Sequence, residues 1–199
     1  NGEIYNFLEL RKELEAKNHI FKTKTDTEVI VHLYEDYGEE CVKKLRGMFA
    51  FALYDIEKKE LFLARDHIGI IPLYIGWDNK GIVYVSSELK AIESKCDKLQ
   101  EFPPGHYYLG SDDNFVKWYD PLWSKTTPDE TVSLKKLRQS LEDSVKKQLM
   151  CDVPYGVLLS GGLDSSLIAA IAASYSKKRI ESGSKEDAWW PRMHSFAIG

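Results

Sequence analysis

The spacing of apolar residues predicts helices at the start of the chain. Apolar side chains first recur every three or four residues, which predicts a helix over 7–17 with Asn6 as its cap. The same spacing predicts a second helix that begins after Thr25 or Asp26, and a short third helix over 39–45. Three helices are therefore expected before the first strand.

Short aromatic and β-branched runs replace this spacing after residue 47. Turn signals rich in Lys, Asp, Asn and Gly separate the runs, as expected for antiparallel hairpins. Helices before such a sheet, with a short helix over 88–92, predict an α+β fold in which helices are layered on the sheet. The predicted strands are 48–55, 60–64, 73–77, 82–85, 106–109 and 115–119.

A different pattern begins beyond residue 132. Residues 121–132 contain prolines and charges without apolar periodicity, so we predict a linker there between a domain over 1–120 and another over 133–199. The second domain begins with an amphipathic helix over 133–150. Strand, helix and strand then predict the first parallel βαβ unit of a Rossmann-like α/β sheet with both faces covered. These three elements are predicted at 155–159, 167–175 and 193–198.

Composition excludes several classes of protein. The 199 residues include 27 Lys and Arg against 31 Asp and Glu, a formal net charge of −4, and 43% apolar residues. No apolar run approaches the ~20 residues of a membrane span, and neither a signal peptide nor a basic block for nucleic acid is apparent. Three irregularly spaced cysteines indicate reduced thiols. We therefore expect a cytoplasmic (cytosolic) protein with no membrane or nucleic-acid partner.

The strongest chemical signal is the segment Ser160 to Ser166, Ser-Gly-Gly-Leu-Asp-Ser-Ser, between a predicted strand and helix. Glycines allow a tight turn, and the N–H groups of a first helical turn favour an anion, so the segment predicts a phosphate site. It is not a P-loop, because the chain contains no Gly-Lys pair. Asp164 would repel a bare polyphosphate unless it helped to hold Mg²⁺. The alternative is a serine-capped helix after a glycine turn.

This segment resembles the PP-loop of the ATP pyrophosphatases, which cleave ATP between its α and β phosphates. Over essentially its whole length, the chain resembles the glutamine-dependent asparagine synthetase family. Trp189-Trp190-Pro191 before 194–196 resembles that family's synthetase domain. The segments that resemble its amidotransferase domain are 1–6, 25–28, 47–52, 64–74, 86–91 and 102–105.

The resemblance implies an enzyme with two sites and an N-terminal-nucleophile fold in its first domain. That domain would hydrolyse glutamine, and a tunnel would carry ammonia to the second domain. There ATP would activate aspartate as β-aspartyl-AMP and ammonia would displace AMP, a carbon–nitrogen ligation. The implied substrates are glutamine, aspartate and ATP, with Mg²⁺ as cofactor. The sequence is silent on oligomeric state, and a homodimer stays open.

Four residues carry implied roles toward glutamine. Asn1, through its side-chain amide, and Gly2, through its backbone N–H, resemble the donors that stabilise the oxyanion of amide hydrolysis. Glu3 and Asp26 resemble the carboxylates that bind the α-amino group of glutamine, where negative charges suit an ammonium. The alternatives are an Asn-Gly turn with an exposed Glu3, and Asp26 as the N-cap of the second helix.

Other residues carry implied roles toward ATP. Leu159 and Ile198, the latter through its backbone, resemble positions that contact the nucleoside, at the carboxyl ends of parallel strands. The alternative is that both are simply buried strand residues. The residues implied to bind the polyphosphate are Ser160, Gly161, Gly162, Asp164 and Ser165.

The chain also departs from the family it resembles. The resemblance implies a nucleophilic cysteine at the mature N-terminus, and Cys41, Cys96 and Cys151 are not placed to be that residue. Asn1 already lies inside a motif, so we expect an internal segment that does not make asparagine by itself. The part from residue 133 offers little apolar surface, which predicts that it is unstable alone.

Two other functions stay open from the sequence. A relative such as β-lactam synthetase would keep the PP-loop with another acceptor, although the intact glutamine motif argues against it. A non-catalytic nucleotide- or amino-acid-binding module is the third interpretation. Arg65 and Asp66 are interpreted as structural, and the five histidines, which show no Ser-His-Asp or metal-ligand spacing, are assigned no role.

Overall fold

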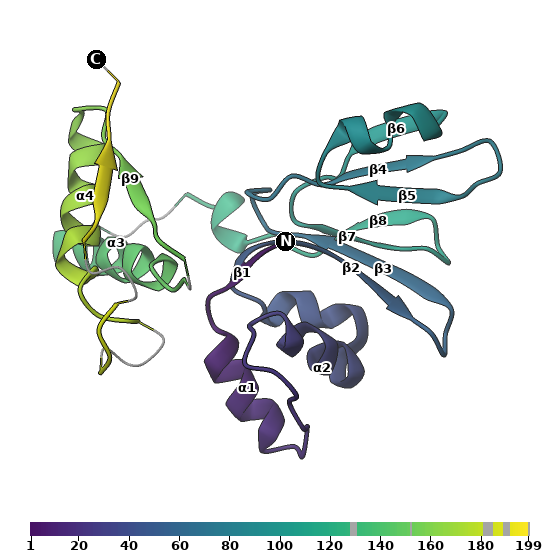
Figure 1. The fold of residues 1–199 in the computed structure, drawn as a ribbon, viewed down its shortest axis with the longest axis horizontal. Helices are drawn as coiled ribbons and strands as arrows, with labels where there is room; N and C mark the ends of the chain where they lie inside the picture. The colour runs from purple at the N-terminus through teal and green to yellow at the C-terminus, as the bar shows by residue number, and fades with distance from the viewer. Residues whose placement is uncertain (128–130, 152, 181–184, 189–191, 199) are drawn as a thin grey trace. The chain divides into compact units, whose positions relative to one another are not determined.

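The computed structural model describes residues 1–127, 131–151, 153–180, 185–188 and 192–198. The chain divides into two compact units, Asn1–Thr127 and Pro128–Gly199 (Figure 1). This division falls inside the segment 121–132 that the sequence predicts as a linker. Trp189, Trp190 and Pro191 of the predicted synthetase motif lie outside the described residues.

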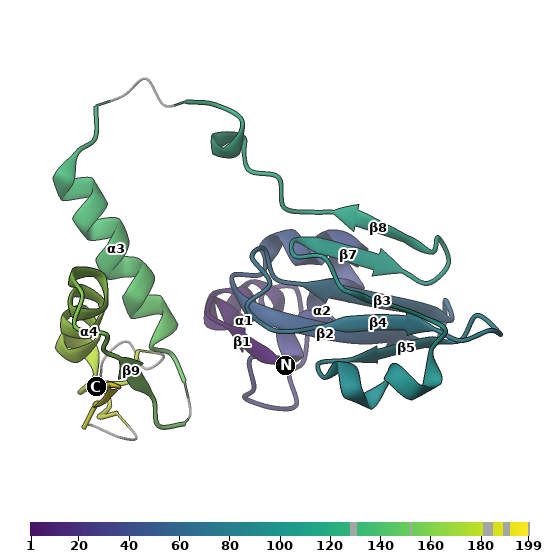
Figure 2. The same cartoon turned by 90° about the horizontal axis from the view of Figure 1, so that it is seen from above.

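Two antiparallel sheets form the framework of the first unit (Figures 1 and 2). The five-stranded sheet has the order β1-β2-β3-β7-β8, and the three-stranded sheet has the order β5-β4-β6. Neighbouring strands in both sheets are antiparallel, as predicted. Their bounds are β1 Gly2–Ile4, β2 Gly47–Asp55, β3 Glu60–Arg65, β4 Tyr74–Trp77, β5 Val83–Ser86, β6 Lys98–Glu101, β7 His106–Leu109 and β8 Asn114–Lys117.

Helices cover one face of the five-stranded sheet, and the three-stranded sheet lies over the other (Figure 1). Leu14 and Phe62, both fully buried, belong to the core between helices and sheet. Successive strand residues point to opposite faces, so Leu63 packs in the second core, between the two sheets. Helix, sheet and sheet in three layers confirm the α+β class. The helices are α1 Phe7–Glu15, α2 Glu28–Tyr37 and the 3-10 helix Gly38–Lys44.

The sequence missed two strands and misjudged some helices of this unit. It gave no strand at β1 or β6, because these are three and four residues long and largely polar. The helix predicted over 7–17 ends at Glu15, and the one predicted over 39–45 is a 3-10 helix. The remaining 3-10 helices are Leu89–Ala91 and Glu93–Lys95, where one helix over 88–92 was predicted, and Leu122–Ser124.

Asn6 is the N-cap residue of α1, as predicted, but its side chain is bonded elsewhere. The side chain makes no capping hydrogen bond. Instead Nδ2 donates to the carbonyl of Lys44 at 2.9 Å, and Oδ1 accepts from the N–H of Arg46 at 2.9 Å. Asn6 therefore fastens the end of β1 to the chain just before β2.

The described residues of the second unit form two helices and a parallel pair of strands. β9 and β10 are parallel with α4 between them in sequence, which confirms the predicted βαβ unit. Helix α4 begins at Leu163 rather than at the predicted residue 167. Across the part of the chain that the structure describes, no helix combines the length and apolarity needed to cross a membrane. The bounds are α3 Leu134–Gln148, β9 Gly156–Leu158, α4 Leu163–Tyr175 and β10 His194–Phe196.

The prediction that this small sheet is covered on both faces is wrong for the described residues. Ile171 of α4 and Val145 of α3 are buried, and Val157 of β9 packs against them. The next residue along β9, Leu158, is 82% exposed, and Phe196 of β10 is 61% exposed. One face of the strand pair is therefore packed on helices while apolar side chains project from the other.

Candidate functional site

Strand β1 lies at the edge of the five-stranded sheet, so β2 is its one strand neighbour. The backbones of Asn1 and Ala50 exchange two hydrogen bonds of 3.0 Å, and the N–H of Tyr5 again donates across the pair at 2.7 Å. Hydrogen-bonded and non-hydrogen-bonded positions alternate along an antiparallel pair. Gly2 and Ile4 therefore hold the non-hydrogen-bonded positions, and their N–H groups point away from β2.

Asp26 meets this outer edge of β1. Its Oδ2 accepts from the N–H of Ile4 at 2.8 Å, and its Oδ1 accepts from the hydroxyl of Thr27 at 3.1 Å. The N-cap of α2 is Thr27, without a side-chain capping bond, so the alternative role of Asp26 as N-cap is wrong. The Asp26 carboxylate instead joins the start of α2 to β1 and lies about 7 Å along the strand from the N–H of Gly2.

Residue 2 must be glycine for β1 to lie this close to β2. Gly2 has φ +122°, and a Cβ built on it would stand 2.0 Å from the carbonyl oxygen of Met48. Gly47 is equally crowded, because a Cβ there would stand 2.0 Å from the carbonyl oxygen of Glu3. Two glycines facing two backbones thus set the position of β1, and with it the position of the outward N–H of Gly2.

The same edge is acidic. Glu3 and Asp26 are both half-buried. Burial raises the pKa of Tyr5, and the negative charge of Glu3 raises that pKa further. The carboxylates can bind an ammonium group by charge. The outward N–H nearby can donate to an oxygen that gains negative charge. The structure thus brings Asn1, Gly2, Glu3 and Asp26 to one strand edge.

A buried ionic group stabilises β2 behind this edge. Asp66 is fully buried, and its carboxylate accepts hydrogen bonds from the N–H groups of Phe49, Ile68, Ile70 and Ile71 at 3.1–3.3 Å. Phe49 is the residue of β2 that lies opposite Gly2. Arg65, also buried, donates to the carbonyls of three residues: Gly69, Ile71 and Phe102. Both residues have the structural role that the sequence indicates.

Two of the three cysteines are poorly suited to act as a nucleophile. Burial raises the pKa of the Cys41 thiol to about 12, and the charges of Glu39 and Glu40 act in the same direction. Burial also raises the pKa of Cys96. The thiol of Cys151 donates to the carbonyl of Val153 at 3.2 Å. Because a thiolate is the nucleophilic form, the raised pKa values disfavour Cys41 and Cys96 as nucleophiles.

In the second unit, the turn from Ser160 to Ser166 joins β9 to α4. Gly161 has φ +83° with open space around it, and Gly162 is the N-cap of α4 without a side-chain capping bond. The alternative of a serine-capped helix is therefore wrong. The N–H groups of the first helical turn have no carbonyl partner within the helix. The start of α4 therefore offers N–H donors and a helix dipole to an anion.

Hydroxyl groups order this turn from within. The Oγ atoms of Ser160 and Ser165 lie 2.9 Å apart, and the hydroxyl of Ser166 donates to the carbonyl of Gly162 at 2.8 Å. Asp164 is exposed in the first turn of α4, beside these hydroxyls in sequence. A carboxylate at this place can hold a hard cation against an anion bound by the helix start.

Leu159 and Ile198 lie at the same end of the strand pair. The N–H of Leu159 donates to the carbonyl of Phe196 at 2.8 Å, just past the ends of β9 and β10. Leu159 is half-buried, whereas Ile198 is fully exposed beyond β10. The alternative that both are buried strand residues is therefore wrong. Both follow the carboxyl ends of parallel strands, where open α/β sheets bind ligands.

Comparison with protein families assigns both parts of the chain. Residues 1–114 match the family model of the glutamine amidotransferase domain, and residues 136–199 match the model of asparagine synthase. The chain belongs to the glutamine amidotransferase domain family, and its second part is similar to asparagine synthase.

Curated relatives cover the whole chain. It is 50% identical to asparagine synthetase B [glutamine-hydrolyzing] of Escherichia coli (strain K12), and it spans 36% of the length of that protein. It is 48% identical to a probable asparagine synthetase [glutamine-hydrolyzing] of Dictyostelium discoideum, which it covers to 37%. The chain thus spans little more than a third of the length of these relatives.

Solved structures share the fold. A chain described as the allosteric regulatory enzyme of purine biosynthesis superposes with a TM-score of 0.53 at 26% identity, over 88% of this chain and 42% of its own. A glutamine phosphoribosylpyrophosphate amidotransferase from B. subtilis superposes with a TM-score of 0.54 at 23% identity, over 99% of this chain and 44% of its own. The second likeness concerns the fold alone.

Proposed function

We propose that this chain is part of a glutamine-hydrolysing asparagine synthetase. Residues 1–120 form its amidotransferase domain, 121–132 a linker, and 133–199 the beginning of its ATP-dependent synthetase domain. The observation that carries the proposal is that one chain joins matches to a glutamine amidotransferase domain and to asparagine synthase. Near 50% identity to named synthetases along its whole length supports the same assignment.

The first domain binds and hydrolyses glutamine. Glu3 and Asp26 bind its α-amino group, which suits the acidic edge of β1. Attack on the side-chain amide turns the carbonyl oxygen into an oxyanion, which accepts from the N–H of Gly2 and the side-chain amide of Asn1. Loss of one such donor raises the barrier by about 2.7–4 kcal/mol. The products are glutamate and ammonia. The nucleophile is neither Cys41 nor Cys96, in line with their raised pKa values.

The second domain activates aspartate with ATP. The N–H groups at the start of α4, with Gly161 and Gly162, bind the polyphosphate, and Ser160 and Ser165 add hydroxyl donors. Leu159 and the backbone of Ile198 contact the nucleoside. The β-carboxylate of aspartate attacks the α-phosphorus, the bond to the β-phosphate oxygen breaks, and pyrophosphate leaves. Ammonia then attacks the resulting mixed anhydride, so that asparagine forms and AMP departs.

The proposal includes a magnesium ion, a homodimer and a cytosolic location. Asp164 would hold Mg²⁺ beside the phosphates, because an exposed carboxylate at a phosphate-binding helix start is a suitable oxygen ligand. When bound, the ion neutralises charge on the leaving pyrophosphate. The homodimer and the cytosolic location stay predictions.

The experiment that tests this function compares two nitrogen donors in the full-length protein. Pyrophosphate and asparagine are measured with ATP, Mg²⁺, aspartate and either glutamine or ammonium. Asp26→Asn is expected to lower the glutamine-dependent rate at least about 10-fold, because one of two charges facing the ammonium is lost, and to leave the ammonium-dependent rate intact. Asp112→Asn, in an exposed loop of the same unit, is the control.

The outcomes separate the candidate functions. Absence of aspartate-dependent pyrophosphate release from the wild type would reject the synthetase assignment. Release of pyrophosphate with another acceptor would support a β-lactam synthetase-like ligase. An equal loss with both donors in Asp26→Asn would reject its role toward glutamine while leaving the synthetase assignment standing.

A further inference from the structure

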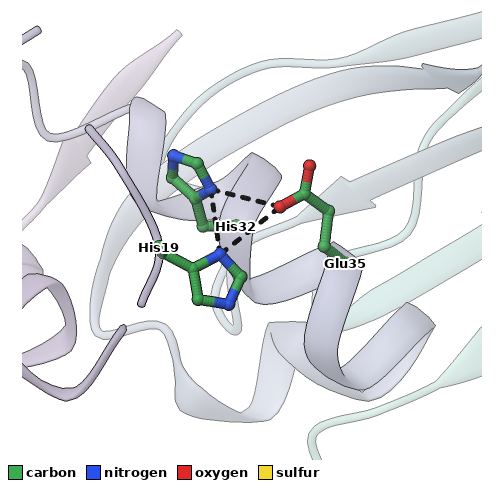
Figure 3. A group of neighbouring side chains, drawn as sticks. All are labelled: His19, His32 and Glu35. Atoms are coloured by element: carbon green, nitrogen blue, oxygen red, sulfur yellow. Dashed lines mark hydrogen bonds and ion pairs between the residues drawn. The ribbon is translucent and has the colours of Figure 1, made fainter. Parts of the chain in front are cut away.

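Two histidines and a glutamate meet between the loop after α1 and helix α2 (Figure 3). The Nδ1 atoms of His19 and His32 lie 3.2 Å apart. Oε2 of Glu35 lies 3.4 Å from Nδ1 of His19 and 3.2 Å from Nδ1 of His32. The three atoms thus form a nearly equilateral triangle and face one another. His32 and Glu35 are three residues apart on α2, whereas the loop brings His19 to them.

The outer nitrogen of each ring faces a different carboxylate. Nε2 of His19 lies 2.9 Å from Oδ1 of Asp36, and Nε2 of His32 lies 3.7 Å from Oε1 of Glu28. The Asp36 carboxylate accepts a hydrogen bond from Nε2 of His19, which favours the neutral tautomer with the proton on Nε2. At 3.7 Å, Glu28 acts on His32 through its charge and not through a hydrogen bond. In that tautomer of His19 the lone pair is on Nδ1. Three atoms that can each offer a lone pair therefore converge on one point, an arrangement that suits a metal ion; without one, hydrogen bonds link the same atoms.

The triangle has the dimensions of a metal site. A tetrahedral Zn²⁺ with bonds of about 2.0–2.1 Å keeps neighbouring ligand atoms about 3.3 Å apart. The three observed separations of 3.2, 3.2 and 3.4 Å match this value. Two imidazoles and one carboxylate are a known ligand set for zinc, with a water in the fourth position. The hydrogen bond from the outer nitrogen of His19 to the Asp36 carboxylate is the kind of support that a metal-binding imidazole usually has.

The two imidazoles are mostly buried, whereas the carboxylate of Glu35 is open to solvent. The side chains of His19 and His32 are 14% exposed, while that of Glu35 is 57% exposed. The ring of Phe21 packs on His32 with centroids 4.4 Å apart. The rings are thus fixed before an ion arrives, and the exposed side of Glu35 admits both the ion and its water.

We propose that His19, His32 and Glu35 form a binding site for a divalent transition-metal ion, with Zn²⁺ as the best fit. The site is separate from those assigned to glutamine and ATP. The ion fastens the loop after α1 to helix α2. This loop continues to Asp26, and the carboxylate of Glu28 already binds the N–H groups of Lys22 and Thr23 at 2.6 and 2.7 Å.

The test is titration of the whole chain with Zn²⁺ after removal of metals by a chelator. Calorimetry is expected to show one Zn²⁺ per chain that excess Mg²⁺ does not displace, because Mg²⁺ prefers oxygen ligands. Glu35→Gln is expected to lower the affinity at least about 10-fold, and Asp36→Asn about 10-fold by loosening the hold on His19. His32→Ala removes the site. His194→Gln, an exposed imidazole in the second unit, is the matched control.

A second measurement on the same proteins distinguishes loss of the metal site from misfolding of a variant. Zn²⁺ is expected to raise the melting temperature of the wild type and of His194→Gln, and to raise that of Glu35→Gln by clearly less at the same Zn²⁺ concentration. Glu35 is largely exposed, so this variant keeps the fold and decides the matter if His32→Ala does not fold. Absence of binding by the wild type, or an affinity that Glu35→Gln leaves unchanged, would overturn the proposal.

Discussion

The edge of β1 and the turn from Ser160 to Ser166 position their polar groups by different means. At β1, Gly2 and Asp26 come from separate elements, and sheet register with a packed core brings them together. At the turn, the donors lie within seven consecutive residues, ordered by one glycine of positive φ and the start of α4. The first site therefore depends on the fold of its whole unit, whereas the second depends mainly on local backbone conformation.

Burial differs in the same way. Glu3 and Asp26 are half-buried, with fully buried Asp66 behind the neighbouring strand. Asp164 is exposed, and so are Leu158 and Leu163 on either side of its turn. A half-buried edge suits a small zwitterion whose charges must be distinguished, while exposed N–H groups suit a large polyanion. Substitutions at the first site should therefore affect stability as well as chemistry, whereas replacing the exposed Asp164 side chain at the second should affect chemistry with little change in stability.

The largest expected effect on activity separates chemistry from stability at the turn. In the full-length protein, Asp164→Asn is expected to lower pyrophosphate release at least about 100-fold, or ~2.7 kcal/mol of barrier, because the proposed ligand for Mg²⁺ is lost. Glutamine hydrolysis should stay largely intact, and stability should change by less than about 0.5 kcal/mol at so exposed a position. Assays of the two half-reactions and a urea titration measure these effects. Asp143→Asn, exposed on α3, is the control, and equal loss of both half-reactions would contradict the contrast.

The second effect concerns stability at β1. Gly2→Ala would place a Cβ 2.0 Å from the carbonyl oxygen of Met48 at φ +122°. Strain and overpacking together should lower the free energy of unfolding by about 3 kcal/mol or more. Denaturation in urea, followed by tryptophan fluorescence, measures the loss.

Two other glycines provide matched comparisons for Gly2. Gly81 has φ +77° and Gly161 has φ +83°, each with nothing within 4 Å of a built Cβ. Alanine at either position should cost only the backbone strain, about 1–2 kcal/mol. Similar losses at all three positions would show that close packing of β1 on β2 is not what distinguishes the first site.

The smallest expected effect is a change in acid stability of the first unit. The carboxylate of Asp55 accepts from the N–H groups of Lys58 and Glu57 at 2.9 and 3.0 Å, and these bonds lower its pKa. A lowered pKa in the folded state means that its contribution is present above about pH 3.9, the value in the unfolded chain, and is lost as pH falls below that value. In Asp55→Asn, the free energy of unfolding should fall less steeply as the pH is lowered from about 6 to about 2, as measured by urea titrations. A profile that matches the wild type would contradict the assignment, and Asp112→Asn is the control.

The sequence predicts those parts of the fold that repeat a pattern. Helix α2 follows from apolar residues spaced by three and four, and β2 and β3 follow from aromatic and β-branched runs. Strand β1 is too short for any period, and β2 together with glycine sterics determines where it lies. Helix α4 begins earlier than predicted because Asp164, Ser165 and Ser166 disfavour helix interiors but suit a first turn.

The candidate sites follow the same division. The turn at Ser160 can be predicted from the sequence because its donors are contiguous. The contact of Asp26 with Ile4 spans 22 residues, and a capping role was equally open from the sequence. The meeting of His19 with His32 was not foreseen, although the three-residue spacing of His32 and Glu35 on one helix was the available signal. The conformation of the loop after α1 brings His19 to His32, and no local sequence pattern specifies that conformation.

The most direct test of the central claim is a crystal structure of the full-length protein with glutamate and a non-hydrolysable ATP analogue. The predicted result has phosphate oxygens within hydrogen-bond distance of N–H groups in residues 161–165. It also has the side-chain carboxylate of glutamate on the N–H of Gly2, with its ammonium beside Glu3 and Asp26. A nucleotide bound away from this turn, or an N–H of Gly2 paired with the protein itself, would contradict the account.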